Sequence, residues 1–139
     1  MATDTSIPQL HFGPVTRAML ALYAGASGDH NPIHIDSDYA AAAGQKDVFA
    51  QGMLSYGVLA RAVTEWASQD DLLSLDIRFV SITQVHDLIT CTGVIVERFD
   101  RGGEDCMRVA LRAAVQDGRT TLEGEAIVRS RDLEQGGSQ

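Results

Sequence analysis

Residues Gly52 to Trp66, with the sequence GMLSYGVLARAVTEW, decide what fold this chain can adopt. Apolar residues fall on nearly every side of a helix drawn through this stretch, a pattern typical of a helix that is buried all round. Gly57 in its interior costs about 1 kcal/mol relative to alanine, so we expect a close packing neighbour at that position. The rest of the chain must therefore supply a cover for this helix.

The part of the chain after the helix has the pattern of β-strands, expected over residues 72–82, 87–99, 106–116 and 120–129. Alternating apolar residues indicate one buried face on the third of these, comprising Met107, Val109, Leu111, Ala113 and Val115. Hairpin turns are expected at residues 100–104 and at Asp117-Gly118. Helices followed by an antiparallel meander predict an α+β fold, with a sheet long enough to curl around the helix.

Upstream of the long helix, Gln9 to Phe12 are expected to form a short edge strand, and a second helix is expected to start at Thr16 as N-cap. Glycines end that helix by Gly28. Its spacing i, i+3, i+4 predicts one buried face, made of Met19, Leu22 and Tyr23.

The segment Asp29–Asp36 is polar and lies between two helical patterns. Its Asn31-Pro32 pair favours a turn, because the residue before proline is disfavoured in the α region. Ser37 is expected to cap the short helix that follows. We therefore expect an ordered loop that displays polar side chains.

The composition describes one ordinary globular domain, expected to span residues 1–132 with a disordered tail at 133–139. The net charge of −8 argues against a nucleic acid or an anionic membrane surface as partner, because phosphates are bound by clustered Lys and Arg. Cys91 and Cys106 have no metal-binding spacing. The sequence begins without a signal-peptide pattern and contains no apolar run of about 20 residues, so a soluble cytoplasmic protein is expected.

The segment Tyr23–His34, YAGASGDHNPIH, resembles the hydratase motif of the MaoC-like dehydratases, also called (R)-specific enoyl-CoA hydratases. The Gly52-Met53 step and the meander after it are also similar to that family. The resemblance implies a hotdog fold, dimers, and an acyl-thioester tunnel along the subunit interface. It also implies addition of water across a trans-2-enoyl thioester, with Asp29 and His34 as the catalytic pair.

Two features bear on specificity and assembly. Many members of the family have histidine before the glycine of the long helix, where this chain has Gln51. Residues 46–49 and 64–66 are similar to small hotdog subunits of hydratases that act on steroid side-chain CoA thioesters, some of which pair with a non-identical partner. We therefore expect a homodimer, with a heterodimer containing a second hotdog subunit as the alternative.

The chemistry of hydration assigns roles to four residues. Asp29 and His34 can hold one water molecule between them, with one group accepting its proton and one returning a proton to the substrate. The backbone N–H of Gly52, free at the start of the helix, can stabilise the oxygen of the developing enolate. Asn31 is expected to brace the loop. The reaction needs no metal or redox cofactor, and the sequence offers no ligand cluster for one.

Other interpretations stay open at this point. Outside the motif, Asp29 would be a turn residue and His34 a structural histidine. An acyl-CoA thioesterase is a second possible enzyme, and a subunit that only completes a partner's tunnel is a third possibility. The acyl group and the cations that bind the CoA phosphates are not determined by the sequence, although Lys46, Arg78 and Arg108 are available.

Overall fold

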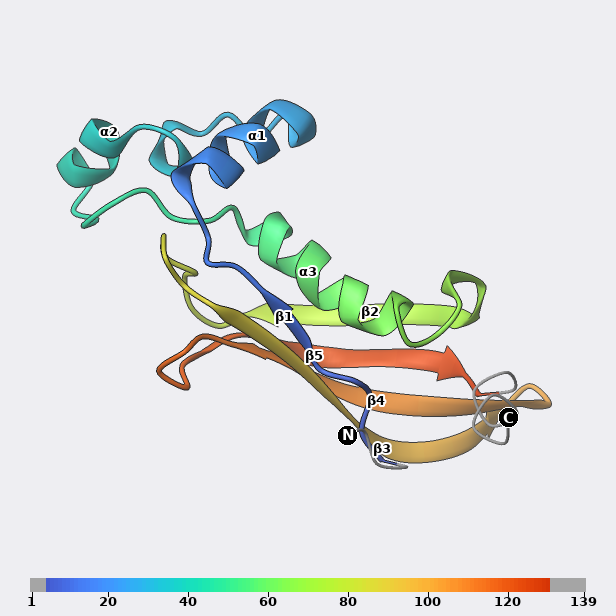
Figure 1. Ribbon diagram of the computed structural model, residues 1–139. Helices are drawn as coiled ribbons and strands as arrows, with labels where there is room; N and C mark the ends of the chain where they lie inside the picture. Colours follow the sequence, from blue (N-terminus) through green and yellow to red (C-terminus); the bar gives the residue numbers. More distant parts are fainter. Residues whose placement is uncertain (1–4, 131–139) are drawn as a thin grey trace.

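The computed structural model describes residues 5–130 and contains a curved antiparallel sheet crossed by one long helix (Figure 1). A smaller helical segment extends from the start of the long helix, at the upper left of Figure 1. In chain order the elements are β1 (Leu10–Phe12), α1 (Arg17–Ser27), η1 (Pro32–His34), α2 (Ser37–Ala42), α3 (Gly52–Thr64), η2 (Gln69–Asp71), β2 (Leu72–Phe79), β3 (Ile89–Arg101), β4 (Glu104–Ala114) and β5 (Thr120–Arg129).

The five strands form one sheet in the order β1-β3-β4-β5-β2, and every neighbouring pair is antiparallel. Both predicted hairpin turns are confirmed. Gly102 and Gly103 join β3 to β4 with φ of 63° and 89°, and Gly118 between β4 and β5 has φ of 89°. Glycine adopts these left-handed conformations without a steric penalty, so these positions fix where the chain reverses.

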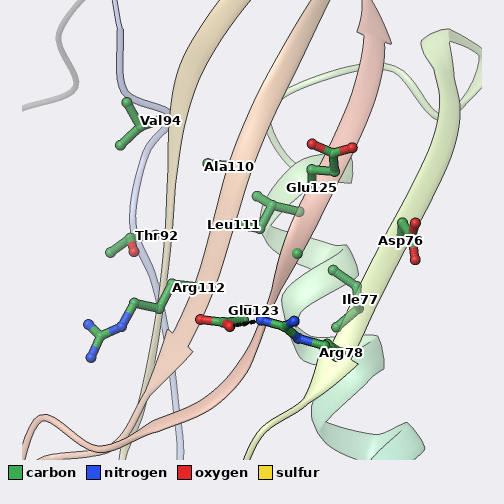
Figure 2. Close-up of a pocket in the computed structure, with 11 residues that line it drawn as sticks. Asp76, Ile77, Arg78, Thr92, Val94, Ala110, Leu111, Arg112, Glu123 and Glu125 are labelled. Atoms are coloured by element: carbon green, nitrogen blue, oxygen red, sulfur yellow. Dashed lines mark hydrogen bonds and ion pairs between the residues drawn. The ribbon is translucent and has the colours of Figure 1, made fainter.

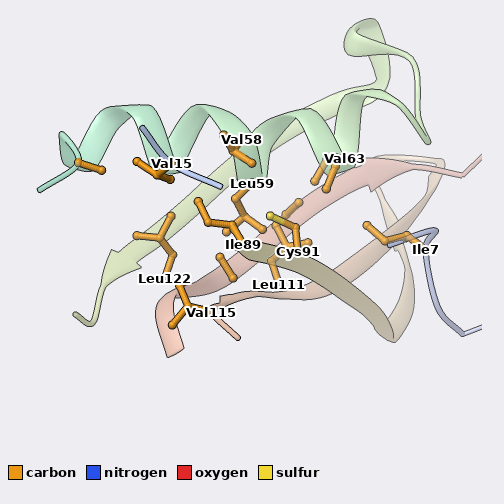
Figure 3. Close-up of a cluster of buried hydrophobic side chains, with 14 of the residues drawn as sticks. Ile7, Val15, Val58, Leu59, Val63, Ile89, Cys91, Leu111, Val115 and Leu122 are labelled. Carbon is orange, nitrogen blue, oxygen red and sulfur yellow. The ribbon is translucent and has the colours of Figure 1, made fainter. Parts of the chain in front are cut away.

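The hydrophobic core lies between α3 and the facing surface of the sheet (Figure 3). Leu59 and Val63 on α3 are fully buried, and they belong to one cluster with Cys91, Leu111 and Leu122 from the three central strands. The alternation predicted for β4 is confirmed, because all five of its expected core residues are buried. The α+β class predicted from the sequence is therefore confirmed as well.

The prediction that the long helix is buried all round is wrong for the single chain. Met53 is 56% exposed, and Gly57 is exposed with no neighbouring atom within 4 Å of an added Cβ. The expected packing neighbour of Gly57 is therefore absent from residues 5–130. The physical reason is that the single sheet covers one side of α3 and leaves the opposite side uncovered.

The predicted start of α1 is confirmed, but its predicted buried face is wrong. The hydroxyl of Thr16 accepts a hydrogen bond from the Met19 amide at 3.1 Å, as an N-cap does. The buried residues of the helix are Leu20 and Ala24, whereas Leu22 is 76% exposed. Several residues of this helix have apolar side chains, and the spacing alone does not decide which of the overlapping faces meets the body of the protein.

One further local expectation is corrected. The N-cap of α2 is Asp36 rather than Ser37, because the Asp36 carboxylate accepts from the amides of Asp38 and Tyr39. In the turn after α3, Asp71 is only 2% exposed, and its carboxylate lies 3.9 Å from the Arg129 guanidinium. The expected tail at residues 133–139 lies outside the described residues. Within residues 5–130, no helix combines the length and the apolar character needed to span a bilayer.

Candidate active site

The loop between α1 and α2 holds the two residues predicted to be catalytic. Helix α1 ends at Gly28, whose φ of 81° turns the chain so that Asp29 follows outside the helix. The Asn31 carboxamide oxygen accepts from the Ile33 amide at 3.1 Å, and the Asp29 carboxylate accepts from the Asn31 amide at 3.4 Å. These local hydrogen bonds order the loop without help from a sheet.

His34 is buried, and one of its ring nitrogens is already engaged. Nδ1 lies 2.8 Å from the carbonyl oxygen of Phe49, and the Phe49 ring packs edge-on against the imidazole at a centroid distance of 5.1 Å. A carbonyl oxygen can only accept a hydrogen bond, so we assign the hydrogen of the neutral ring to Nδ1. Nε2 of neutral His34 then has a free lone pair and can act as a base.

That free nitrogen faces Asp29. Nε2 of His34 and Oδ2 of Asp29 are 3.8 Å apart, which is too far for a direct hydrogen bond. Polar atoms at this separation are suited to a bridging water molecule that bonds to both. The Asp29 side chain is half exposed, whereas that of His34 is nearly covered. The two residues named from the sequence are thus brought together, with the more exposed one on the side of the solvent.

The start of α3 is placed next to this pair by the connector that precedes it. The Ala50 amide donates to the carbonyl oxygen of Thr83 at 2.9 Å, and Phe49 forms a β-bridge with Gln84. This pairing fixes the Phe49 carbonyl that receives the His34 hydrogen, three residues before Gly52. The connector therefore couples the position of the imidazole to the position of the helix start.

The Gly52 amide is free to donate. It has no acceptor among residues 5–130, and it lies at the N-terminus of a 13-residue helix, where the helix dipole is positive. A Cβ added to Gly52 would lie 2.9 Å from Cε1 of Phe79, so a side chain at this position would displace that ring. Glycine allows the Phe79 ring to lie this close to the start of the helix.

Gln51 has a role that the sequence reasoning missed. Its side chain is fully buried, and Nε2 donates to the Leu20 carbonyl of α1 at 3.0 Å, which ties α1 to the start of α3. Oε1 is buried and has no hydrogen-bond partner among the described residues. The sequence signal for this role is a polar residue directly before an apolar helix. Such a residue must find a hydrogen-bond partner when it is buried.

Two of the hollows in residues 5–130 are lined by residues of β2, and they lie on opposite faces of the sheet. A pocket of about 310 Å³ lies beside the start of α3 and is lined in part by Phe49, Gly52 and Phe79. A hollow of about 650 Å³ lies on the face of the sheet opposite α3, where Figure 2 shows Arg78 paired with Glu123. Only the first of these cavities is near the residues predicted to be catalytic.

Two of the three cations considered for CoA phosphates are already in ion pairs. Arg78 pairs with Glu123. Arg108 bonds Glu97 and Glu125, each at 2.8 Å, and the hydrogen bond to Glu97 is the main reason that the Arg108 pKa is raised. In the part of the chain that the structure describes, Lys46 has neither an ion pair nor a side-chain hydrogen bond, so it is the most available of the three.

Two other kinds of reactive side chain are potential metal ligands and thiols. No group of three or more His, Cys, Asp or Glu within residues 5–130 is placed to hold a metal ion. Both cysteines are buried as free thiols, and burial raises the pKa of Cys91 to about 11. A thiol with that pKa stays protonated and unreactive at neutral pH.

Comparisons with known proteins agree with this architecture. The R-hydratase PhaJ1 from Pseudomonas aeruginosa superposes with a TM-score of 0.79 at 25% identity, covering 93% of this chain and 81% of that chain. The ChsH1-ChsH2 complex from Mycobacterium tuberculosis gives a TM-score of 0.76 at 22% identity, with 93% and 98% coverage. The (R)-hydratase from A. caviae gives 0.74 at 21% identity, with 91% and 96% coverage. These likenesses confirm the hotdog fold.

A comparison of sequences adds one relative and one family. The 3-oxo-4,17-pregnadiene-20-carboxyl-CoA hydratase beta subunit of Mycobacterium tuberculosis is 32% identical over 71 residues, which is half of this chain. That match spans only 55% of the relative's length. The MaoC like domain matches residues 3–116, and the chain therefore belongs to the MaoC-like dehydratase family, a family of hydratases and dehydratases.

Proposed function

We propose that this protein is an (R)-specific enoyl-CoA hydratase that adds water across a trans-2-enoyl-CoA thioester, or catalyses the reverse dehydration. The observation that carries the proposal is the 3.8 Å separation of Asp29 Oδ2 from the free Nε2 of His34, together with the unpaired amide of Gly52, which comes three residues after the Phe49 carbonyl that bonds His34. A base, a second polar group for the same water molecule and an oxyanion donor are the groups that the reaction requires.

In the hydration direction, one water molecule is bonded by Asp29 and by Nε2 of His34. Its oxygen attacks C3 of the enoyl group while Nε2 accepts a proton, and the electrons of the double bond move onto the thioester oxygen. The Gly52 amide stabilises the resulting enolate. Protonated His34 then returns the proton to C2, so that one molecule of water is added and the enzyme is restored.

Values typical of other enzymes give the contribution that each of these groups is expected to make to the rate. General acid–base catalysis supplies about 10²–10⁴ in rate. One oxyanion donor is worth about 2.7–4 kcal/mol of transition-state stabilisation in other enzymes. The Phe49 carbonyl supports the first contribution, because its hydrogen bond from Nδ1 of His34 favours the tautomer with Nε2 as base.

The uncovered side of α3 supports a dimer as part of the proposal. Strand β2 is an edge of the sheet, and the uncovered side of α3 carries the exposed apolar side chain of Met53. A second chain would cover these groups and extend the sheet. We propose a homodimer first. A heteromeric pair is the second candidate, since the M. tuberculosis relative is called a beta subunit and ChsH1 and ChsH2 form a complex.

The same relative motivates a candidate acyl group. Its name describes a hydratase of a steroid-type CoA thioester, so bulky acyl groups belong in any substrate panel beside linear ones. The purified chain is to be mixed with crotonyl-CoA, longer linear enoyl-CoAs and steroid-type enoyl-CoAs, and the loss of conjugated-thioester absorbance is measured. We expect turnover by the native protein and little turnover by Asp29→Asn or His34→Ala.

Four outcomes contradict parts of this proposal. If no enoyl thioester is consumed, or if both variants keep full rates, the hydratase mechanism is wrong. Release of free CoA thiol from saturated acyl-CoA would instead identify a thioesterase. Activity that appears only after a second hotdog chain is added, and that survives Asp29→Asn, would identify an accessory subunit.

A further inference from the structure

The pocket of about 310 Å³ beside α3 begins at the residue that carries the proposed oxyanion donor. Gly52 forms part of its wall, and Phe49, whose carbonyl holds His34, forms another part. A thioester oxygen bonded to the Gly52 amide would therefore place one end of the substrate at the mouth of this pocket. The pocket is thus in position to receive a group attached directly to the thioester.

The lining of this pocket suits hydrocarbon. Phe79, Val80 and Ile82 contribute exposed apolar side chains from the end of β2 and the loop after it. The hydroxyls of Ser55 and Thr83 also face this region, and they hydrogen-bond to each other at 3.3 Å. Their mutual bond reduces what they offer to a ligand, so an acyl chain fits this lining better than the amide-rich arm of CoA does.

Among the residues that line the pocket, Phe79 has the side chain with the most freedom to move. Its ring is 55% exposed, whereas Leu122 on the opposite side is fixed in the core and Phe49 packs on His34. The Phe79 ring meets Gly52 on one side and the Tyr56 ring, at a centroid distance of 6.3 Å, on another. The volume of the pocket is at the lower end of small-molecule sites, which span about 300–1,000 Å³.

We propose that Phe79 is the specificity-determining residue of this site, and that its ring limits the pocket to compact acyl groups. The inference rests on the proposed hydratase function and adds to it the part of the substrate that this pocket selects. A short linear enoyl group fits beside the ring in the position described. A long or polycyclic group requires the ring to rotate away from Gly52.

The experiment compares the kcat/KM of crotonyl-CoA with that of trans-2-dodecenoyl-CoA in the full chain. Phe79→Ala removes the wall, and we expect the preference for crotonyl-CoA to fall by about tenfold or more, within the range that pocket contacts supply. Phe79→Trp narrows the pocket and is expected to shift the preference in the opposite direction. Phe79→Leu keeps an apolar side chain and guards against a fold that does not tolerate alanine.

The matched control is Phe99→Ala. Phe99 is a partly exposed aromatic residue on β3 that lies under the Arg108 guanidinium at 5.5 Å and does not line the pocket. Phe99→Ala removes the same side-chain atoms as Phe79→Ala, and it is expected to leave the ratio of the two kcat/KM values unchanged. A role of Phe79 in stability alone would lower both rates together, and it would therefore leave that ratio unchanged too.

The possible results separate the two proposals. If the native chain hydrates enoyl-CoA and all three Phe79 variants keep the native ratio, the inference about Phe79 is overturned and the hydratase function stands. If the ratio moves down in Phe79→Ala and up in Phe79→Trp, the inference is supported. If the native chain turns over no enoyl thioester, the proposed function fails, and the inference that rests on it fails too.

Discussion

The body of the molecule and the segment that carries the proposed catalytic pair are built in different ways. The body consists of α3 and the sheet, and a continuous apolar cluster between long paired strands holds it together. The segment formed by residues 13–50 has two helices and a polar loop that is ordered by local hydrogen bonds. Five of its residues enter that cluster, namely Val15, Leu20, Ala40, Val48 and Ala50. The comparison teaches that the proposed catalytic pair lies in a loop held by local hydrogen bonds, whereas the body is held by packing between distant elements.

The polar segment is attached to the body at a few defined points. The Val15 amide donates to the Asp87 carbonyl at 3.0 Å, and Gln51 bonds the Leu20 carbonyl at 3.0 Å. The hydrogen bond from His34 to Phe49 is a third attachment, and it is also part of the proposed mechanism. Changes at these points should affect geometry at the site more than they affect the core.

The largest expected effect is on rate and comes from the polar segment. His34→Ala removes the proposed base, and kcat should fall by about 10²–10⁴. The free energy of unfolding should change less than it does for a core truncation, because the ring makes one hydrogen bond and one aromatic contact. Enoyl-CoA turnover and urea unfolding of the same preparation measure the two quantities. A variant that unfolds at room temperature would contradict the division between the two regions.

The second effect is on stability and comes from the body. Leu59→Ala leaves a cavity at a fully buried position between α3 and the sheet, and should destabilise the fold by about 2–5 kcal/mol. Turnover per folded molecule should stay close to native, because Leu59 does not line the pocket beside Gly52. Urea unfolding with activity corrected for the folded fraction tests this. A loss of turnover larger than the loss of folded protein would show that the core also shapes the site.

The third prediction concerns the link between the two regions. In the native protein the Leu20 carbonyl accepts a hydrogen bond from the Gln51 side chain. Gln51→Glu removes that hydrogen and places a buried carboxylate against the carbonyl, so we expect the free energy of unfolding to fall by about 2–3 kcal/mol. Methionine has a side chain of similar length without a polar end, and Gln51→Met also removes the unpaired Oε1. The loss of stability in Gln51→Met should therefore be clearly smaller than in Gln51→Glu. Thermal unfolding of both variants measures the difference. An equal loss of stability in the two variants would refute the hydrogen bond between Gln51 and Leu20.

A smaller effect is expected for the cap within the loop. Asn31→Ala removes the oxygen that accepts a hydrogen bond from the Ile33 amide, and it should lower the free energy of unfolding by about 0.5–2 kcal/mol. Asn31→Asp keeps the acceptor and is the matched control. If Asn31 braces the loop, hydrogen exchange of the Ile33 amide should become faster in the alanine variant and stay near native in the aspartate variant. Equal exchange in all three proteins would remove this role from Asn31.

The smallest effect concerns an exposed ion pair in the polar segment. The hydrogen bond from Arg17, with help from the Val48 amide, lowers the pKa of Asp47 below its usual value. A lowered folded pKa means that the contribution to stability is present above the unfolded pKa of about 3.9 and is lost as the pH falls through the folded pKa. Asp47→Asn should therefore be slightly less stable than the native protein at pH 7. At pH 2–3 the two proteins should unfold at converging urea concentrations, and a difference that persists there would contradict the pairing.

Much of the architecture could be predicted from the sequence because local rules dominate it. Alternation along β4 identified its buried face, and glycine at residues 102, 103 and 118 identified the reversals of the chain. The start of α1 at Thr16 followed from cap chemistry. In each case, the information is contained in a few neighbouring residues. The loop motif likewise named Asp29 and His34 before their separation of 3.8 Å was known.

Only the tertiary structure decided which surfaces are covered and which atoms meet. Leu22 and Met53 are as apolar as the residues beside them, yet they are exposed, because the rest of the chain covers α1 and α3 from one side only. The partner of Gln51, the acceptor for Nδ1 of His34 and the ring against Gly52 all come from distant parts of the chain. The sequence by itself determined the elements and the residue types of the site. Long-range packing determined which ring nitrogen of His34 faces Asp29, which ring lies against Gly52 and what shape the pocket has, because these depend on contacts between segments that no local pattern records.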